Sequence, residues 1–381
     1  MVRSIMVRNV SRVVIRVAAA ALACASCMIA VACDRSAMES ADALARFSAA
    51  PADTVPSRFA RNLVGTMAGN AVEVTLRRDG DRMWGSTSDD ETGFEGTVAR
   101  DGAVVLSLWN PRGPAPDTLR GTLSVGPEGL ALRGALHGLA GPRPVELAEE
   151  RFALDSGARL TARDIAEGDS AAGFTIYAQL PVLVPPEGRA LTAAERAFNE
   201  AAEALVDQPL DEFRRFIGES EPLPPEWTGA PVSSFNTAYD VALADAELLS
   251  LEFGISIYYA GAAHPGHATR TLTWDLGSNR AVELADLFQG GVDYLARISE
   301  TTIPAIERAL GDDADASWIA EGAGPSPANY ESWTLTPEGL RIVFDQYQVA
   351  PYAAGPQSVV VPWRDLAPHL DPAGPAARLA P

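Results

Sequence analysis

The sequence predicts two folded parts in a fixed order. An N-terminal antiparallel β meander, closed as a small barrel or sandwich, precedes an α+β domain that has an antiparallel sheet and about three helices. Short apolar runs of period two recur roughly every ten residues before residue 155, which is typical of antiparallel strands. After residue 170, strand-like and helix-like spacings follow each other in separate blocks, which is typical of an α+β domain.

The composition is that of a strongly acidic globular chain. Of its 381 residues 47% are hydrophobic, and its formal net charge is -20. All 30 basic residues are Arg, since the sequence contains no Lys. Nucleic acid is therefore not expected as a partner, because an acidic surface repels phosphates. The absence of Lys also excludes a P-loop lysine and a Schiff-base lysine.

Residues 1–32 have the pattern of a secretory signal peptide. Four Arg precede an apolar run from Val17 to Ala32, and small residues stand before a possible cleavage site. The run is short for a transmembrane helix, so an uncleaved anchor is the weaker alternative. We therefore expect an exported protein.

The end of this run resembles the lipobox of bacterial lipoproteins. The sequence Ala30-Val31-Ala32-Cys33 predicts lipidation at Cys33, which would hold the protein on the periplasmic face of a membrane. Cys24 fits the pattern less well because its apolar region would be short, and a soluble periplasmic or secreted protein is the further alternative. Asp34 resembles a signal for retention at the inner membrane. The expected membrane contact is thus a lipid anchor.

Residues 33–58 are small, polar and rich in Pro, as expected of a flexible tether. The predicted β-rich domain covers 59–155. Its strand-like runs are separated by turn signals and include Val72–Leu76, Gly93–Val98, Val104–Trp109, Leu119–Val125 and Leu130–Leu136. The glycines in GTMAG, FEGTV and LRGTL indicate bends or close backbone approaches rather than phosphate loops.

The predicted α+β domain covers 170–372, followed by a tail at 373–381. Thr192 and Glu195 have the spacing of a capping box ahead of a helix, and Pro209 is expected to open a second, short helix. A third helix is expected from about 292 to 310, with Gly311 ending it. The expected strands are Phe174–Leu180, Asn236–Asp245, Glu247–Tyr259, Leu272–Leu276, Ser332–Thr336, Leu340–Gln346 and Val359–Trp363, the last completing the sheet.

Motifs for catalysis or metal binding are scarce. His264 and His267 form the closest histidine pair, but no HExxH motif and no second ligand cluster accompany them. No G-x-S-x-G elbow occurs, and acidic runs such as Asp89-Asp90-Glu91 and Asp312-Asp313 are typical of a solvated surface. We therefore expect no catalytic residue, no metal and no cofactor.

Tyrosines concentrate at the ends of predicted strands. Tyr259 ends one strand, and Tyr347 and Tyr352 flank the sequence YQVAPYAAG. Such side chains can stack on a sugar or anchor a protein interface, and they can equally pack in a core. Together with His264 they form the predicted ligand-binding set, on the hypothesis that all four lie close together.

The C-terminal half resembles the bacterial family called domain of unknown function 3298, over residues of about 170–370. The motifs that carry the resemblance keep their order and are YAGAAHP at 259–265, TWDL at 273–276, VELADLF at 282–288, FDQYQVAPYAAG at 344–355 and VVVP at 359–362. This domain forms the extracellular part of the lysozyme-sensing anti-sigma-V factor and accompanies the catalytic domain of some peptidoglycan deacetylases. The resemblance implies an envelope domain that binds a ligand, with a lysozyme-like hydrolase or the wall itself as the candidate.

The sequence departs from these relatives in two respects. At most 16 residues precede the apolar run, too few for the cytoplasmic segment of an anti-sigma factor, and no stretch matches a deacetylase catalytic domain. We therefore expect a non-catalytic envelope lipoprotein that binds a cationic hydrolase or peptidoglycan. The alternatives are a hydrolase acting on peptidoglycan or glycan, with His264 at its centre, and a structural envelope spacer.

Overall fold

A computed structural model describes residues 55–87, 92–110, 117–126, 129–139, 141–150, 152–154, 156–169, 172–220 and 232–381. The described residues form two compact units, which divide at Phe152. Each unit is described by itself below. The predicted signal peptide, the candidate lipidation site Cys33 and nearly all of the predicted tether lie outside the described residues, as does the acidic run Asp89-Asp90-Glu91.

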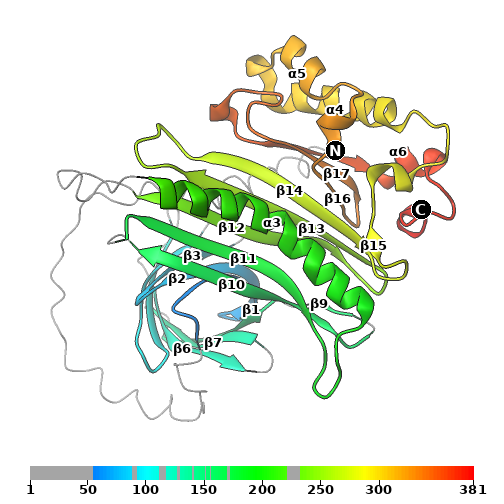
Figure 1. Ribbon diagram of the computed structural model, residues 1–381. Coiled ribbons are helices and arrows are strands. Elements are labelled where there is room, and N and C mark those ends of the chain that lie inside the picture. The colour runs from blue at the N-terminus through cyan, green and yellow to red at the C-terminus, as the bar shows by residue number, and fades with distance from the viewer. Residues whose placement is uncertain are drawn as a thin grey trace. The chain divides into compact units, whose positions relative to one another are not determined.

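The first unit is a closed antiparallel barrel, which confirms the predicted meander and decides between the two predicted forms, barrel and sandwich (Figure 1). Each strand pairs with the next along the chain, and the last pairs with the first through Leu63–Met67 and Val145–Glu149. The strands are β1 (Arg58–Met67), β2 (Asn70–Asp79), β3 (Arg82–Thr87), β4 (Gly93–Val98), β5 (Ala103–Trp109), β6 (Thr118–Gly126), β7 (Gly129–His137) and β8 (Arg143–Glu149).

Alternation along the strands fills the barrel with apolar side chains. Leu63, Met83 and Leu123 are fully buried there, as expected where one face of each strand points inward. Two glycines permit close approach of neighbouring strands, because a Cβ on Gly65 or Gly96 would lie 2.0 Å from a carbonyl oxygen of the adjacent strand. The predicted role of these glycines is confirmed.

The second unit is built on a seven-stranded sheet of order β15-β14-β13-β12-β11-β10-β9. Its strands are β9 (Phe152–Ala153), β10 (Arg159–Asp169), β11 (Phe174–Val184), β12 (Ser233–Ala244), β13 (Leu248–Tyr258), β14 (Gly266–Asp275) and β15 (Arg280–Ala281). Strands β11 and β12 are parallel, so the sheet is mixed rather than antiparallel throughout. The sequence predicts this domain from residue 170 onward, whereas strands β9 and β10 extend its sheet back to Phe152.

Helix α3 (Ala193–Glu219) lies along one face of this sheet (Figure 1). The predicted capping box is present, because Thr192 accepts a hydrogen bond from the Glu195 backbone and the Glu195 side chain accepts one from the Thr192 backbone. The expectation that Pro209 opens a separate helix is wrong. The helix continues through Pro209 because its buried stripe runs on to Leu210 and Phe213.

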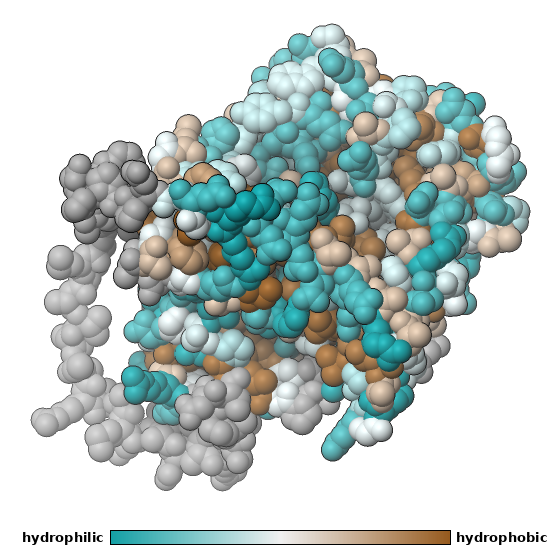
Figure 2. Space-filling model, viewed as in Figure 1, coloured by the Kyte–Doolittle hydropathy of each residue, from teal (hydrophilic) through white to brown (hydrophobic). Residues whose placement is uncertain are grey.

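The outer side of α3 carries charged residues, and hydrophilic groups are visible along it in Figure 2. Arg163 of β10 pairs with Glu203 of the helix, and Glu167 of β10 pairs with Arg214. These ion pairs connect the helix to a strand that offers few apolar side chains on this face.

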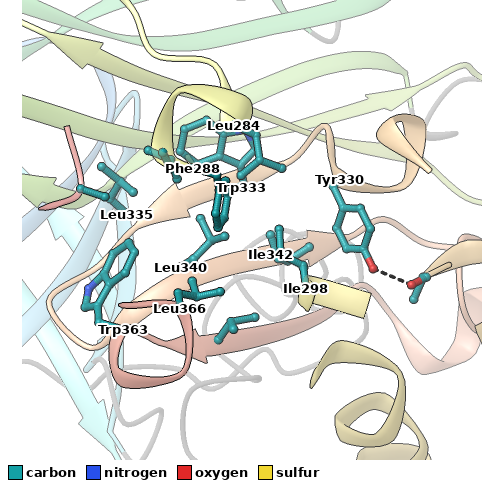
Figure 3. Close-up of a cluster of buried hydrophobic side chains, with 14 of the residues drawn as sticks. Leu284, Phe288, Ile298, Tyr330, Trp333, Leu335, Leu340, Ile342, Trp363 and Leu366 are labelled. Carbon is teal, nitrogen blue, oxygen red and sulfur yellow. Dashed lines mark hydrogen bonds between the residues drawn. The ribbon is translucent and has the colours of Figure 1, made fainter. Parts of the chain in front are cut away.

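A smaller three-stranded sheet, β16 (Trp333–Leu335), β17 (Gly339–Phe344) and β18 (Gln357–Pro362), completes the second unit. The prediction that the last strand completes the main sheet is therefore wrong. Helices α4 (Tyr294–Leu310), α5 (Ala316–Gly322) and α6 (Trp363–Leu366) accompany it. Figure 3 shows the hydrophobic cluster to which Ile298 of α4, Leu340 and Ile342 of β17, and Trp363 all belong.

Residues 373–381, expected as a tail, pack against the rest of the second unit. Ala376 is fully buried, and Leu379 packs against the cluster of Figure 3. The Arg378 guanidinium donates to both carboxylate oxygens of Asp245, at 2.6 and 2.7 Å, in the turn between β12 and β13. We call this contact the C-terminal clamp.

Candidate functional site

Three of the four predicted site residues lie together in the second unit. His264 precedes β14, while Tyr347 and Tyr352 lie in the loop that follows β17. The ring centroids of His264 and Tyr352 are 4.0 Å apart, and those of Tyr347 and Tyr352 are 5.7 Å apart. His267, at the start of β14, lies 6.2 Å from Tyr352. We call these four residues the loop cluster.

Hydrogen bonds from outside the loop cluster fix its shape. The Asp345 carboxylate accepts the backbone N–H of Thr269 at 3.0 and 3.1 Å, which joins the β17 loop to the edge of β14. Gln348 donates to the carbonyl oxygens of Gly322 and Asn329 and accepts the Asp345 N–H. The loop is thereby held on both sides of Tyr347.

Tyr347 has an unusual backbone and a largely exposed ring. Its φ of 68° lies in the left-handed region, which costs a non-glycine residue of order 1 kcal/mol. Its side chain is 53% exposed, so the ring gains little from burial. Its carbonyl oxygen accepts the Trp318 indole N–H at 3.0 Å, which helps to hold this conformation. Strain of this kind, maintained by surrounding contacts, is often found at functional sites.

Burial changes the proton affinities inside the loop cluster. It lowers the pKa of His267, and the neighbouring His264 lowers it further, against the opposite effect of the Asp345 carboxylate. Burial and, to a smaller extent, the nearby Tyr347 raise the pKa of Tyr352, against the opposite effect of a hydrogen bond with Gln346. The Tyr352 hydroxyl donates to the Pro265 carbonyl oxygen at 3.1 Å and so connects the two loops.

Tyr259, the fourth predicted residue, lies elsewhere. Its ring packs on α3, 4.3 Å from the Phe216 centroid and 6.0 Å from that of Phe213. The period of β13 explains this position, because Phe253, Ile255 and Ile257 all pack on the α3 side and Tyr259 continues their parity. The hypothesis that all four residues lie together is wrong for Tyr259.

The structure adds two residues that the sequence analysis did not assign to the site. Asp345 positions the loop, and His267 contributes a second imidazole. The sequence signals for these two residues are FDQYQ, which contains Asp345, and the pair His264 and His267, which has two residues between its members. Within the described ranges no group of three or more His, Cys, Asp and Glu is arranged to hold a metal ion. Nor does that part of the chain contain a helix of the length and apolarity needed to span a membrane.

The strain at Tyr347 predicts a difference in stability between two small substitutions at this position. Tyr347→Gly is expected to raise the free energy of unfolding by about 1 kcal/mol relative to Tyr347→Ala, because Gly adopts positive φ without a Cβ penalty. Chemical denaturation of both variants measures the difference. Equal stabilities, or a more stable Ala variant, would contradict a strained backbone at this position.

Comparison with known proteins places the family likeness in the second unit. Residues 285–364 match the model of a protein family of unknown function, DUF3298. A segment of 150 residues is 24% identical to peptidoglycan-N-acetylmuramic acid deacetylase PdaC of Bacillus subtilis, covering 39% of this chain and 32% of that protein. Immunogenic protein MPT64 of Mycobacterium tuberculosis is 28% identical over 103 residues, covering 27% of this chain and 44% of that protein.

Solved structures of DUF3298 proteins are similar at low identity. A protein from Bacteroides fragilis has 18% identity and a TM-score of 0.43, covering 57% of this chain and 94% of its own. One from Pseudomonas aeruginosa has 16% identity and a TM-score of 0.40, covering 59% and 96%. The chain spans less than half the length of the curated relatives it matches. The second unit therefore carries the DUF3298 match, at residues 285–364, in the half of the chain whose motifs resemble that family.

Proposed function

We propose that this protein is a non-catalytic, exported component of the bacterial cell envelope that binds a cationic protein, with a lysozyme-like hydrolase as the candidate. Lipidation at Cys33 would attach it to the membrane. The loop cluster, held rigid around an exposed and strained Tyr347, is the observation that carries the proposal. Similarity to a peptidoglycan deacetylase supports a place at the cell wall.

Preorganisation makes the loop cluster suitable for binding. Tyrosine presents a large ring with few rotatable bonds, so little conformational entropy is lost when a partner covers it. The bonds from Asp345 and Gln348 already fix the loop before a partner arrives. A net charge of -20 attracts a basic protein and accelerates its encounter with the surface.

The test is the binding kinetics of a basic lysozyme on the immobilised protein. We expect the association rate to fall several-fold between low and physiological salt, where the Debye length shortens to about 8 Å. Tyr352→Ala is expected to raise the dissociation rate by roughly tenfold, as for an anchor residue. Tyr259→Ala is the matched control, because that ring packs on α3 outside the loop cluster and its loss is expected to leave the kinetics unchanged.

Other outcomes would overturn the proposal. If association does not depend on salt and Tyr352→Ala only lowers the melting temperature, Tyr352 is a core residue and the proposed site is wrong. Hydrolysis of purified sacculi that disappears in His264→Ala would establish the enzymatic alternative. Absence of any binding to lysozyme or to sacculi would favour a structural spacer. Binding to sacculi but not to lysozyme, weakened by Tyr352→Ala, would make the wall the ligand of the loop cluster.

A further inference from the structure

Two tryptophans point outward from the barrel on either side of β4. Trp84 of β3 follows the buried Met83, and Trp109 of β5 follows the buried Leu108, so alternation places both indoles on the outer surface. In the strand register Trp84 stands opposite Glu95 and Trp109 opposite Gly93. The two tryptophans therefore flank positions of β4 that are two residues apart.

The indole of Trp109 lies against Gly93 and remains largely exposed. A Cβ on Gly93 would come within 2.5 Å of the indole Cε2 and Nε1 atoms. Gly93 is buried although its position faces outward, because the indole covers it. Trp109 is nevertheless 57% exposed. The missing side chain at Gly93 thus lets a large aromatic ring rest on the sheet and present its free surface to solvent.

Trp84 has polar groups beside its ring. The Arg82 guanidinium carbon lies 5.9 Å from the ring centroid, within the range of a cation–π contact. The same guanidinium pairs with the Glu95 carboxylate at 3.3 Å, and both side chains are about two-thirds exposed, at 67% and 66%. Hydrogen-bond donors and acceptors therefore stand next to an aromatic surface. We call Trp84, Trp109, Arg82 and Glu95 the tryptophan face.

We propose that the tryptophan face binds a pyranose chain, namely the N-acetylated glycan of the cell wall. Aromatic rings stack on the apolar faces of sugars, and charged groups at the rim bond their hydroxyls. Strands lie about 4.8 Å apart and outward side chains repeat every ~6.7 Å, which separates the two tryptophan Cα atoms by about 12 Å. A chain of a few sugar rings spans that distance.

The negative charge of the chain argues against single-stranded nucleic acid, which also stacks on exposed aromatic rings. Single-stranded nucleic acid combines base stacking with a positively charged groove for its phosphates, whereas this chain carries a net charge of -20. An N-acetylated glycan carries no phosphate and needs no such groove. The choice of the cell wall as its source rests on the envelope location proposed above, but the face belongs to the barrel and shares no residue with the loop cluster.

The experiment titrates the complete chain with an N-acetylglucosamine hexamer. Calorimetry gives the dissociation constant, and saturation-transfer NMR shows which protons of the sugar contact protein. Trp109→Ala and Trp84→Ala are each expected to weaken binding by about fivefold or more. Gly93→Ala is expected to weaken it as well, because the new Cβ displaces the indole. Phe216→Ala removes a partly exposed aromatic ring, 43% against 57% for Trp109, from the other unit outside the loop cluster and is the matched control, expected to leave sugar binding unchanged.

The outcomes separate this proposal from the proposed function. No binding of the hexamer, or binding that Trp109→Ala leaves unchanged, would overturn the tryptophan face while lysozyme binding could still hold. Sugar binding abolished by Tyr347→Ala would also overturn it, by moving the sugar to the loop cluster. If Trp109→Ala lacks a cooperative unfolding transition, Trp84→Ala alone decides, and unchanged affinity in that variant overturns the proposal equally.

Discussion

Arg341→Ala is expected to lower the free energy of unfolding by about 3–5 kcal/mol. Arg341 of β17 donates to the Glu252 carboxylate of β13 at 2.6 Å, and the Glu252 side chain is only 1% exposed. The pair joins the two sheets of the second unit. Removing the guanidinium takes a cation away from a buried carboxylate, and a buried charge that loses an opposite charge costs far more than the intact pair contributes.

Urea denaturation of four proteins measures the effect. Arg341→Ala, Glu252→Gln and the double variant, compared with wild type, give the coupling energy between the two side chains. We expect the double variant to recover part of the loss, because it no longer buries a charge. Arg297→Ala breaks an exposed pair with Glu300 and should change stability by less than about 1 kcal/mol. If Arg341→Ala also lowers stability by less than about 1 kcal/mol, the pair of Arg341 and Glu252 does not stabilise the connection between the sheets.

Acid is expected to weaken the start of α3 through Glu195. Hydrogen bonds from Arg189, with smaller contributions from the Thr192 backbone and Ser156, lower the pKa of Glu195 to about 2 despite its burial. A carboxyl with a lowered folded-state pKa stabilises the fold above its unfolded pKa of about 4.5, and this contribution is lost as pH falls toward 2. The lowered pKa of Glu195 corresponds to a contribution of about 3 kcal/mol to the free energy of unfolding at neutral pH.

Glu195→Gln provides the measurement for this prediction. The difference in unfolding free energy between wild type and Glu195→Gln should be constant above pH 5 or so and should shrink as pH falls toward 2. Glu200→Gln on the same helix replaces an exposed carboxylate and should differ little from wild type at any pH. A wild-type advantage that persists undiminished near pH 2 would show that the carboxylate charge is not the source of the stability.

The barrel could be predicted because its strands show their own pattern. Leu106 and Leu108 alternate with outward-facing residues, and turn signals separate the runs. This local sequence pattern was enough to predict the meander. Closure did not follow from the pattern alone, because the register of β1 with β8 joins Leu63 to Glu149 with no local signal. A barrel and a sandwich have the same alternation, and only the structure separates them.

In the second unit, strand β10 was not predicted because it carries ion-pairing residues. The helix break predicted at Pro209 is absent because the apolar packing of α3 continues past it. On its α3-facing side β10 carries Arg163 and Glu167, which pair with charged residues of α3, so the strand lacks the apolar alternation that would reveal it. A proline inside a helix costs about 3 kcal/mol, but burial of Leu210 and Phe213 on the same stripe favours an unbroken helix. Both errors arose because tertiary contacts outweighed local preference.

The sequence predicted the grouping of site residues that lie in loops. It did not predict the position of Tyr259, whose direction depends on the alternation of side chains along β13. Tyr347 and Tyr352 lie in one short segment, and their approach to His264 followed from the position of both segments at strand ends. Tyr259 also stands at a strand end, but it shares the odd parity of Phe253, Ile255 and Ile257 on β13, which directs its ring toward α3. The bond from Asp345 to the Thr269 backbone spans 76 residues, and nothing in the local sequence indicates it.

The C-terminal clamp has a consequence for the order in which the two units can finish folding. Each barrel strand pairs with its neighbour along the chain, so the barrel can assemble progressively as the polypeptide emerges, with only the closure of β1 on β8 deferred. The clamp joins Arg378 to Asp245 across 133 residues, so this contact of the second unit cannot form until residue 378 has been synthesised and has reached Asp245. The chain loses the entropy of closing this long loop before the contact can stabilise the fold, which slows this late step of folding. A newly made chain therefore passes through a stage with a finished barrel and an unfinished α+β unit, and proteases or chaperones that meet it then will act on the second unit.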